Sequence, residues 1–167
     1  MNKNKQHGKY FENKIAEQFR TALNLSKHEC YRSSFSGARS TVEFGDITFS
    51  DPVKYPFIIE CKYYQSMKLD DFFPECKSYI KEWIKQLLQE KSRYIESFKK
   101  HPITLLVAGR PRLNDSYVLV EDYIDNQFLQ HFNRYMITSI DNTTSIRIVG
   151  LNDLLNIIKC FVEIVNH

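Results

Sequence analysis

Hydrophobic residues recur at intervals of three and four positions in several parts of the chain, a spacing that predicts amphipathic helices. The expected helices cover residues 8–24, 70–100, 123–133 and a final segment that begins at Leu151. In the long second helix, Asp70 or Asp71 is the expected N-cap, because a short carboxylate side chain can accept hydrogen bonds from the free N–H groups of the first turn. Pro74 fits that first turn, where its missing N–H costs least.

Shorter apolar runs between these helices predict β-strands. They are expected at residues 28–34, 45–50, 56–64, 103–109, 116–121, 135–140 and 145–149. A segment rich in Ser, Gly and Arg after the first strand predicts a loop. Because strands and helices are interleaved and no repeat or long linker interrupts them, the order predicts a single mixed α/β domain over residues 1–167.

The composition is that of a globular protein. The chain has 167 residues, of which 43% are hydrophobic and 26% are charged, and this is the size of one domain with its own core. No apolar run approaches the ~20 residues that span a bilayer. The Lys- and Asn-rich first ten residues are not followed by the apolar stretch of a secretory signal. We therefore expect a cytoplasmic protein (in the host cytoplasm if a phage encodes it) with no membrane partner.

Several classes of site are disfavoured by the residue spacing. The four cysteines lie far apart and form no CxxC pair, so neither a disulfide framework nor a zinc knuckle is expected. The five histidines show no metal-ligand spacing, and the GxGxxG and GxxxxGK[ST] nucleotide-binding motifs are absent.

Positive charge is concentrated at the start of the chain. Residues 1–40 contain eight Lys or Arg and three Asp or Glu, against 15 and 17 in the remainder. A basic face that binds an anion such as nucleic acid would explain this asymmetry, and so would a solvated amino terminus.

The segment with the most chemical information joins Gly45-Asp46-Ile47 to Glu60-Cys61-Lys62, fourteen residues further on. Side chains alternate between the two faces of a strand, so Glu60 and Lys62 share one face of an otherwise apolar strand. An unpaired charge buried there would be costly. If the two strands pair as a hairpin, Asp46 at the start of the preceding strand approaches Glu60.

Two carboxylates this close repel each other unless a cation lies between them. A site of hard oxygen ligands suits Mg²⁺, which binds one or two carboxylates together with waters and a phosphate. Lys62 would then contact a phosphate oxygen or help to orient and deprotonate a metal-bound water, and these parts together predict phosphodiester hydrolysis. The alternative is an ordinary Glu–Lys contact on a solvated strand face, worth roughly 0.2–1 kcal/mol.

With these residues the chain resembles the PD-(D/E)xK nuclease superfamily, and within it the archaeal-type Holliday junction resolvases and their phage relatives. Three further segments are similar to parts of those proteins: Gly8-Lys9-Tyr10-Phe11-Glu12 to the first helix, Arg32-Ser33-Ser34-Phe35-Ser36-Gly37 to the Arg…Ser-Gly loop, and Lys85-Gln86-Leu87-Leu88 to the helix after the ExK strand. The likeness covers residues 8 to about 110. Gly45 replaces the proline that usually precedes the aspartate, and the interval from Ser36 to Asp46 is longer than expected.

The resemblance implies a restriction-endonuclease-like fold, in which helices flank a mixed central sheet. It implies a catalytic set of Glu12, Asp46, Glu60, Lys62 and Gln86. It implies that Mg²⁺, or Mn²⁺ in its place, is bound by Glu12, Asp46, Glu60 and the backbone carbonyl of Cys61. The implied DNA-binding residues are Lys5, Lys9, Arg32, Ser36 and Arg39. For Glu12, Gln86 and the two arginines, an ordinary solvated position is the alternative.

The implied function is a Mg²⁺-dependent endonuclease that selects branched DNA, above all four-way junctions. Symmetric cutting of two strands requires a homodimer with two active sites, joined through the final helix or the strands near 103–121. One alternative is a restriction-type or repair endonuclease of the same superfamily that acts on double-stranded DNA. Another is a DNA-binding protein without catalysis on a nuclease fold, although the intact Asp46, Glu60 and Lys62 argue against it.

Overall fold

The computed structural model describes residues 3–33, 43–73, 75–111, 115–121, 135–139 and 145–165. Within these ranges the elements are α1 (Lys3–Leu23), β1 (Cys30–Arg32), β2 (Ile47–Phe49), β3 (Phe57–Tyr63), the 3₁₀ helix η1 (Leu69–Phe72), α2 (Ser78–Phe98), β4 (Ile103–Gly109), β5 (Tyr117–Glu121), β6 (Met136–Ser139), β7 (Ser145–Gly150) and α4 (Leu151–Val165). The described strands form one sheet in the order β1-β2-β3-β4-β5-β7-β6. Among these described strands, only β3 and β4 run parallel to each other, so the predicted mixed α/β class is confirmed.

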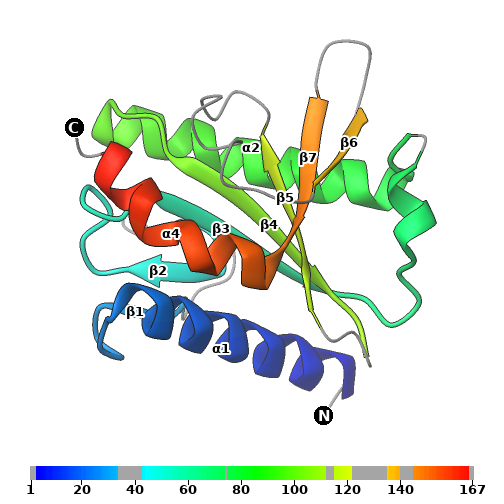
Figure 1. The fold of residues 1–167 in the computed structure, drawn as a ribbon, viewed down its shortest axis with the longest axis horizontal. Coiled ribbons are helices and arrows are strands. Elements are labelled where there is room, and N and C mark those ends of the chain that lie inside the picture. Colours follow the sequence, from blue (N-terminus) through cyan, green and yellow to red (C-terminus); the bar gives the residue numbers. More distant parts are fainter. Residues whose placement is uncertain are drawn as a thin grey trace.

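Helices cover both faces of this sheet (Figure 1), with α1 and α4 on one face and α2 on the other. Alternation along the strands sends Ile59 and Leu105 into the core beneath α1 and α4, while Ile58 and Leu106 join the core beneath α2. All four side chains are fully buried. Because β3 and β4 are covered on both sides, a charged residue within them loses most of its hydration and needs partners.

The parallel pairing of β3 with β4 needs a long connection, and α2 supplies it by crossing one face of the sheet. On the other face, α1 packs closely because β4 ends in Gly109. A Cβ atom on Gly109 would lie 2.5 Å from the ring of Phe11. The missing side chain therefore lets α1 lie against the carboxyl-terminal end of β4.

The start of α2 differs from the prediction, because the helix begins at Ser78 rather than near residue 70. Asp71 lies in η1, where it accepts hydrogen bonds from the N–H of Lys68 (2.8 Å) and the hydroxyl of Tyr79 (2.6 Å). Burial alone would raise the pKa of Asp71, but hydrogen bonds from Lys77, Tyr79 and the Lys68 N–H outweigh it and lower the pKa to about 2. Asp71 thus stabilises the turn before α2, and the expected N-cap was wrong.

Two other predicted features, Pro74 and the helix at 123–133, lie outside the described residues. The strands near 103–121 are β4 and β5, and each is paired on both sides within the sheet, so neither offers a free edge to a second subunit. The apolar face of α4 packs Leu154 and Ile158 into the core. Among the described helices, none is both long and apolar enough to cross a bilayer.

Candidate active site

Asp46 is held against β3 by backbone hydrogen bonds. β2 and β3 pair antiparallel at Ile47 and Ile59, as the hairpin hypothesis requires. The N–H of Asp46 donates to the carbonyl of Ile59 (2.8 Å), and Asp46 Oδ2 accepts a hydrogen bond from the N–H of Cys61 (2.8 Å). The carboxylate is buried. It therefore lies beside the backbone of Glu60, at the start of the Glu60–Lys62 segment.

Gly45 makes this close approach possible. Its φ of +72° lies in the left-handed region, and a Cβ atom on it would lie 2.6 Å from the carbonyl oxygen of Ile59. Proline, whose ring holds φ near about −65°, cannot adopt this conformation. The proline expected before the aspartate is therefore absent for a physical reason, since this chain enters the site through a left-handed glycine.

Ser33 and Thr48, which the sequence did not single out as site residues, support Asp46 from the side of β1 and β2. The N–H of Ser33 donates to the carbonyl of Asp46 (2.9 Å), and its hydroxyl donates to the carbonyl of Gly45 (2.8 Å). The hydroxyls of Ser33 and Thr48 are 2.6 Å apart, and both residues are buried. This polar cluster fixes the backbone carbonyls of Gly45 and Asp46.

Glu60, Lys62 and Gln86 form a closed set of hydrogen bonds between β3 and α2. Lys62 Nζ donates to Glu60 Oε2 (3.2 Å) and to Gln86 Oε1 (2.9 Å), and Gln86 Nε2 donates to Glu60 Oε2 (3.1 Å). Glu60 is 2% exposed. The shared face expected for Glu60 and Lys62 is thus present, and Gln86 reaches it from the helix.

Glu12 approaches the same group from α1. Its Oε2 accepts a hydrogen bond from Arg32 Nη1 at 3.2 Å. Burial raises the pKa of Glu12 and the charge of Asp46 raises it further, whereas Arg32 and Lys62 oppose these effects. Glu12 therefore lies within electrostatic reach of Asp46, and Arg32 pairs with an acidic residue of the site.

The negative charges of these carboxylates are only partly balanced by the nearby cationic side chains. Burial raises the pKa of Glu60 to about 8, and the charge of Asp46 adds to the rise, although Lys62 partly offsets both. Burial also raises the pKa of the Cys61 thiol, and the charges of Asp46, Glu12 and Glu60 raise it further. A cation placed among these groups would favour their ionised forms.

The donor chemistry fits Mg²⁺ or Mn²⁺, both of which prefer carboxylate and carbonyl oxygens. The hydrogen bonds between described residues engage Oδ2 of Asp46 and Oε2 of Glu60, so each carboxylate has a second oxygen for a metal ion. In the part of the chain that the structure describes, no three His, Cys, Asp or Glu side chains form a ready-made cage. Mg²⁺ needs only one or two carboxylates, because water and substrate phosphate complete its coordination.

The expected DNA-binding residues are less fully described. Lys9 is exposed on α1, while Lys5 belongs to the same helix and only its backbone is described. Ser36 and Arg39 lie outside the described residues. The cavity where β3 ends was not predicted, and the two tyrosines that follow Lys62 in the sequence mark only part of its lining.

The model of a family described as "Phage putative PDDEXK endonuclease" matches residues 3–161, which include every site residue named above. No curated protein and no solved structure matches the chain. The superfamily and its restriction-endonuclease-like fold are thereby confirmed, and the resolvase type stays a prediction.

Proposed function

Because the chain belongs to the family of phage putative PDDEXK endonucleases, which indicates a nuclease, we propose that it is a Mg²⁺-dependent endonuclease that hydrolyses phosphodiester bonds in DNA. The observation that carries this proposal is the convergence of Asp46, Glu60 and Lys62 at the junction of β2 and β3. A second buried carboxylate beside an ion pair is unfavourable, because its negative charge raises the cost of ionising the first carboxylate. A purely structural ion pair therefore seldom has one.

In this proposal Asp46 and Glu60 are the principal ligands of the metal ion, and Glu12 and the carbonyl of Cys61 complete the protein's share. When bound, Mg²⁺ lowers the pKa of a water molecule and stabilises negative charge on the phosphate. The N–H of Cys61 holds Asp46 in one orientation, and Arg32 does the same for Glu12. The carboxylates are therefore positioned before substrate arrives.

Lys62 is the residue that meets the reacting phosphate. Its ammonium group, already directed by Glu60 and Gln86, donates to a phosphate oxygen and stabilises the charge that develops there in the transition state. Gln86 is a positioning residue, because it contacts both Lys62 and Glu60. Its loss would leave Lys62 with fewer constraints on its side-chain torsions.

DNA contacts away from the reacting phosphate come from the basic first quarter of the chain. Lys5 and Lys9 on α1, with Ser36 and Arg39 from the loop, are the proposed contacts to the phosphate backbone. Arg32 contributes when its pairing with Glu12 leaves donors for a phosphate, since a guanidinium has five N–H donors. Such contacts recognise DNA by shape and charge, which suits branched substrates and four-way junctions above all.

A homodimer is the proposed working state, because two strands of a junction are cut symmetrically only when two active sites are related by a two-fold axis. Sedimentation of the full chain with and without a junction tests this state. A monomer in both conditions would leave a nuclease that acts on one strand at a time.

The test of function is cleavage of a labelled synthetic four-way junction and of a linear duplex of the same sequences, with Mg²⁺ or Mn²⁺. We expect cutting of the junction by the wild type, loss of cutting in Asp46→Asn and Lys62→Ala, and retained binding in both variants. Lys100→Ala is the matched control, because Lys100 is exposed beyond the end of α2.

Each alternative gives a different result. Equal cutting of the linear duplex would favour a restriction-type or repair endonuclease and remove the junction preference. Binding without cutting under either metal ion would favour a non-catalytic DNA-binding protein. Unchanged cleavage in Lys62→Ala would contradict the role given to Lys62.

A further inference from the structure

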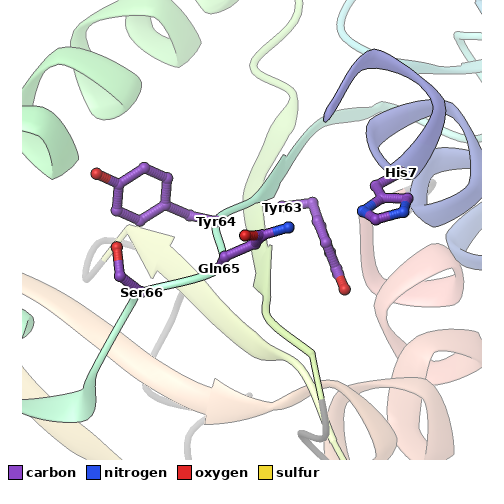
Figure 2. A pocket seen from close by; sticks show the side chains of 5 residues that line it. All are labelled: His7, Tyr63, Tyr64, Gln65 and Ser66. Carbon is purple, nitrogen blue, oxygen red and sulfur yellow. The ribbon is translucent and has the colours of Figure 1, made fainter. Parts of the chain in front are cut away.

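A cavity of about 380 Å³ opens where β3 ends, lined by His7, Tyr63, Tyr64, Gln65 and Ser66 (Figure 2). Four of these residues follow Lys62 directly in the chain, and His7 comes from α1. The volume lies at the lower end of the roughly 300–1,000 Å³ range of small-ligand sites. The cavity therefore suits one small group rather than a duplex.

The tyrosines at this cavity are braced from opposite faces of the sheet. Tyr63 packs against Phe11 of α1 with ring centroids 5.5 Å apart. Tyr64 packs against Tyr79 (5.1 Å) and Trp83 (6.0 Å) of α2, yet it remains 43% exposed. Each ring therefore has a fixed orientation before any ligand binds, and Tyr64 keeps a large free surface for stacking.

Polar groups accompany the rings. Figure 2 shows the amide of Gln65 between the Tyr63 and Tyr64 side chains, with the Ser66 hydroxyl below the Tyr64 ring. An amide offers two donors and an acceptor, and a hydroxyl offers one donor and an acceptor. Aromatic faces together with such groups are what proteins use to stack a nucleobase and bind its edge.

The spacing from Lys62 fits the dimensions of a nucleic acid strand. Lys62 and Tyr64 are two residues apart, which is about 7 Å along a β-strand. That length is about twice the ~3.4 Å rise per nucleotide of one strand in B-DNA. A phosphate at Lys62 would therefore bring a base one or two nucleotides away to the mouth of the cavity.

We propose that this cavity binds an unpaired nucleobase of the DNA strand being cut, so that the substrate carries an unpaired nucleotide within one or two positions of the scissile phosphate. A paired base stacks on its neighbours and presents only its edges, so its face reaches an aromatic side chain only after it leaves the stack. The inference rests on the proposed function, and it adds the requirement that a nucleotide at the branch of the DNA, in a four-way junction as in a flap or a gap, is unpaired when it binds.

The experiment measures binding without cleavage, in the Asp46→Asn background, by fluorescence anisotropy. The probes are a duplex with a short single-stranded extension, the same duplex with an abasic site at the first unpaired position, and a fully paired duplex. We expect Tyr64→Leu to weaken binding of the extended duplex about tenfold, within the roughly 5- to 150-fold loss typical of one base–aromatic stack. Binding of the fully paired duplex should not change.

Two controls separate stacking from a general effect. Tyr64→Phe keeps the ring and should bind as the unmodified background protein does. Tyr135→Leu removes a tyrosine with the same 43% exposure, which lies under Arg147 beside β6, and it should leave binding of all three probes unchanged. The losses of affinity caused by the abasic site and by Tyr64→Leu should not be additive, because each change removes the same contact.

An equal loss for paired and extended probes, or additive losses from the abasic site and Tyr64→Leu, would overturn this inference. Its failure is distinct from failure of the proposed function. If the wild type cuts DNA equally well with and without an unpaired base, the base site alone is refuted. If no DNA is cut with Mg²⁺ or Mn²⁺ while base-dependent binding persists, the nuclease proposal fails and the base site remains.

Discussion

Gly45→Ala tests whether a left-handed glycine brings Asp46 to the site. A residue with a Cβ atom loses roughly 1–2 kcal/mol in this conformation. The added carbon would lie 2.6 Å from the carbonyl oxygen of Ile59 and 3.0 Å from its C and N atoms. These are backbone atoms of a central strand, so relief of the overlap costs a further ~1–3 kcal/mol. We expect the free energy of unfolding to fall by about 2–5 kcal/mol.

Urea denaturation and thermal melting measure this loss, and the melting temperature should fall by at least about 4 °C in a chain of this size. Cleavage should fall more than the unfolded fraction explains, because any shift of Gly45 also moves the bond between the Asp46 N–H and the Ile59 carbonyl. Gly8→Ala is the matched control. Its Cβ meets only Glu12 Oε1 at 3.9 Å, so this helical position should gain about 0.5–1 kcal/mol.

A third variant, Gly45→Pro, restores the residue expected from the superfamily. It should nevertheless be less stable and less active than Gly45→Ala, because the φ angle of proline cannot become positive. Wild-type stability and cleavage in either variant would refute the claim that this turn positions Asp46.

Other substitutions test packing and charge. Gly109→Ala places a carbon 2.5 Å from the Phe11 ring, so urea denaturation should show that the free energy of unfolding falls by about 1–3 kcal/mol. An unchanged free energy would mean that α1 can move away from β4 without cost. Asp71 has its pKa lowered to about 2, so its contribution to stability is present above the unfolded value of ~3.9 and is lost as the pH falls through 2. Asp71→Asn should therefore have a lower melting temperature than the wild type at pH 7 and should lose part of the fall in stability at acid pH. Equal melting curves for the two proteins across the acid range would contradict the role of Asp71. Burial raises the pKa of Glu60 to about 8, so the metal-free folded state retains a proton that the unfolded state releases, and stability should fall as the pH rises from ~4.5 to 8. Glu60→Gln in EDTA should flatten this decline, and the same decline in both proteins would exclude Glu60 as its source.

The sequence predicted the parts of the fold that depend on local pattern. The apolar run at 103–109 coincides with β4 because every residue of this strand is buried. The final helix begins at Leu151 as expected, because its buried residues Leu151, Leu154 and Ile158 recur at helical spacing. The pairing of Glu60 with Lys62 followed from strand alternation alone, and Asp46 joined them once β2 and β3 were taken as a hairpin.

Features that depend on distant contacts escaped prediction. Asp71 looked like the N-cap of a helix, but its partners include Tyr79, the second residue of α2, and only the folded chain brings them together. Ser33 fell at the end of the strand predicted at 28–34 and in the segment that resembles the Arg…Ser-Gly loop, and neither pattern predicted that it is buried and bonded to Gly45 and Asp46. The cavity at Tyr63 needs a wall from α1, which no local pattern around β3 could supply.

The claim that Asp46 and Glu60 hold one divalent ion beside Lys62 is tested most directly by anomalous scattering from a crystal soaked in Mn²⁺. We predict a single strong peak within about 2.2 Å of an oxygen of each carboxylate, absent from Asp46→Asn crystals treated in the same way. A peak at some other place, or no peak while Glu60 stays bonded to Lys62 and Gln86, would contradict it.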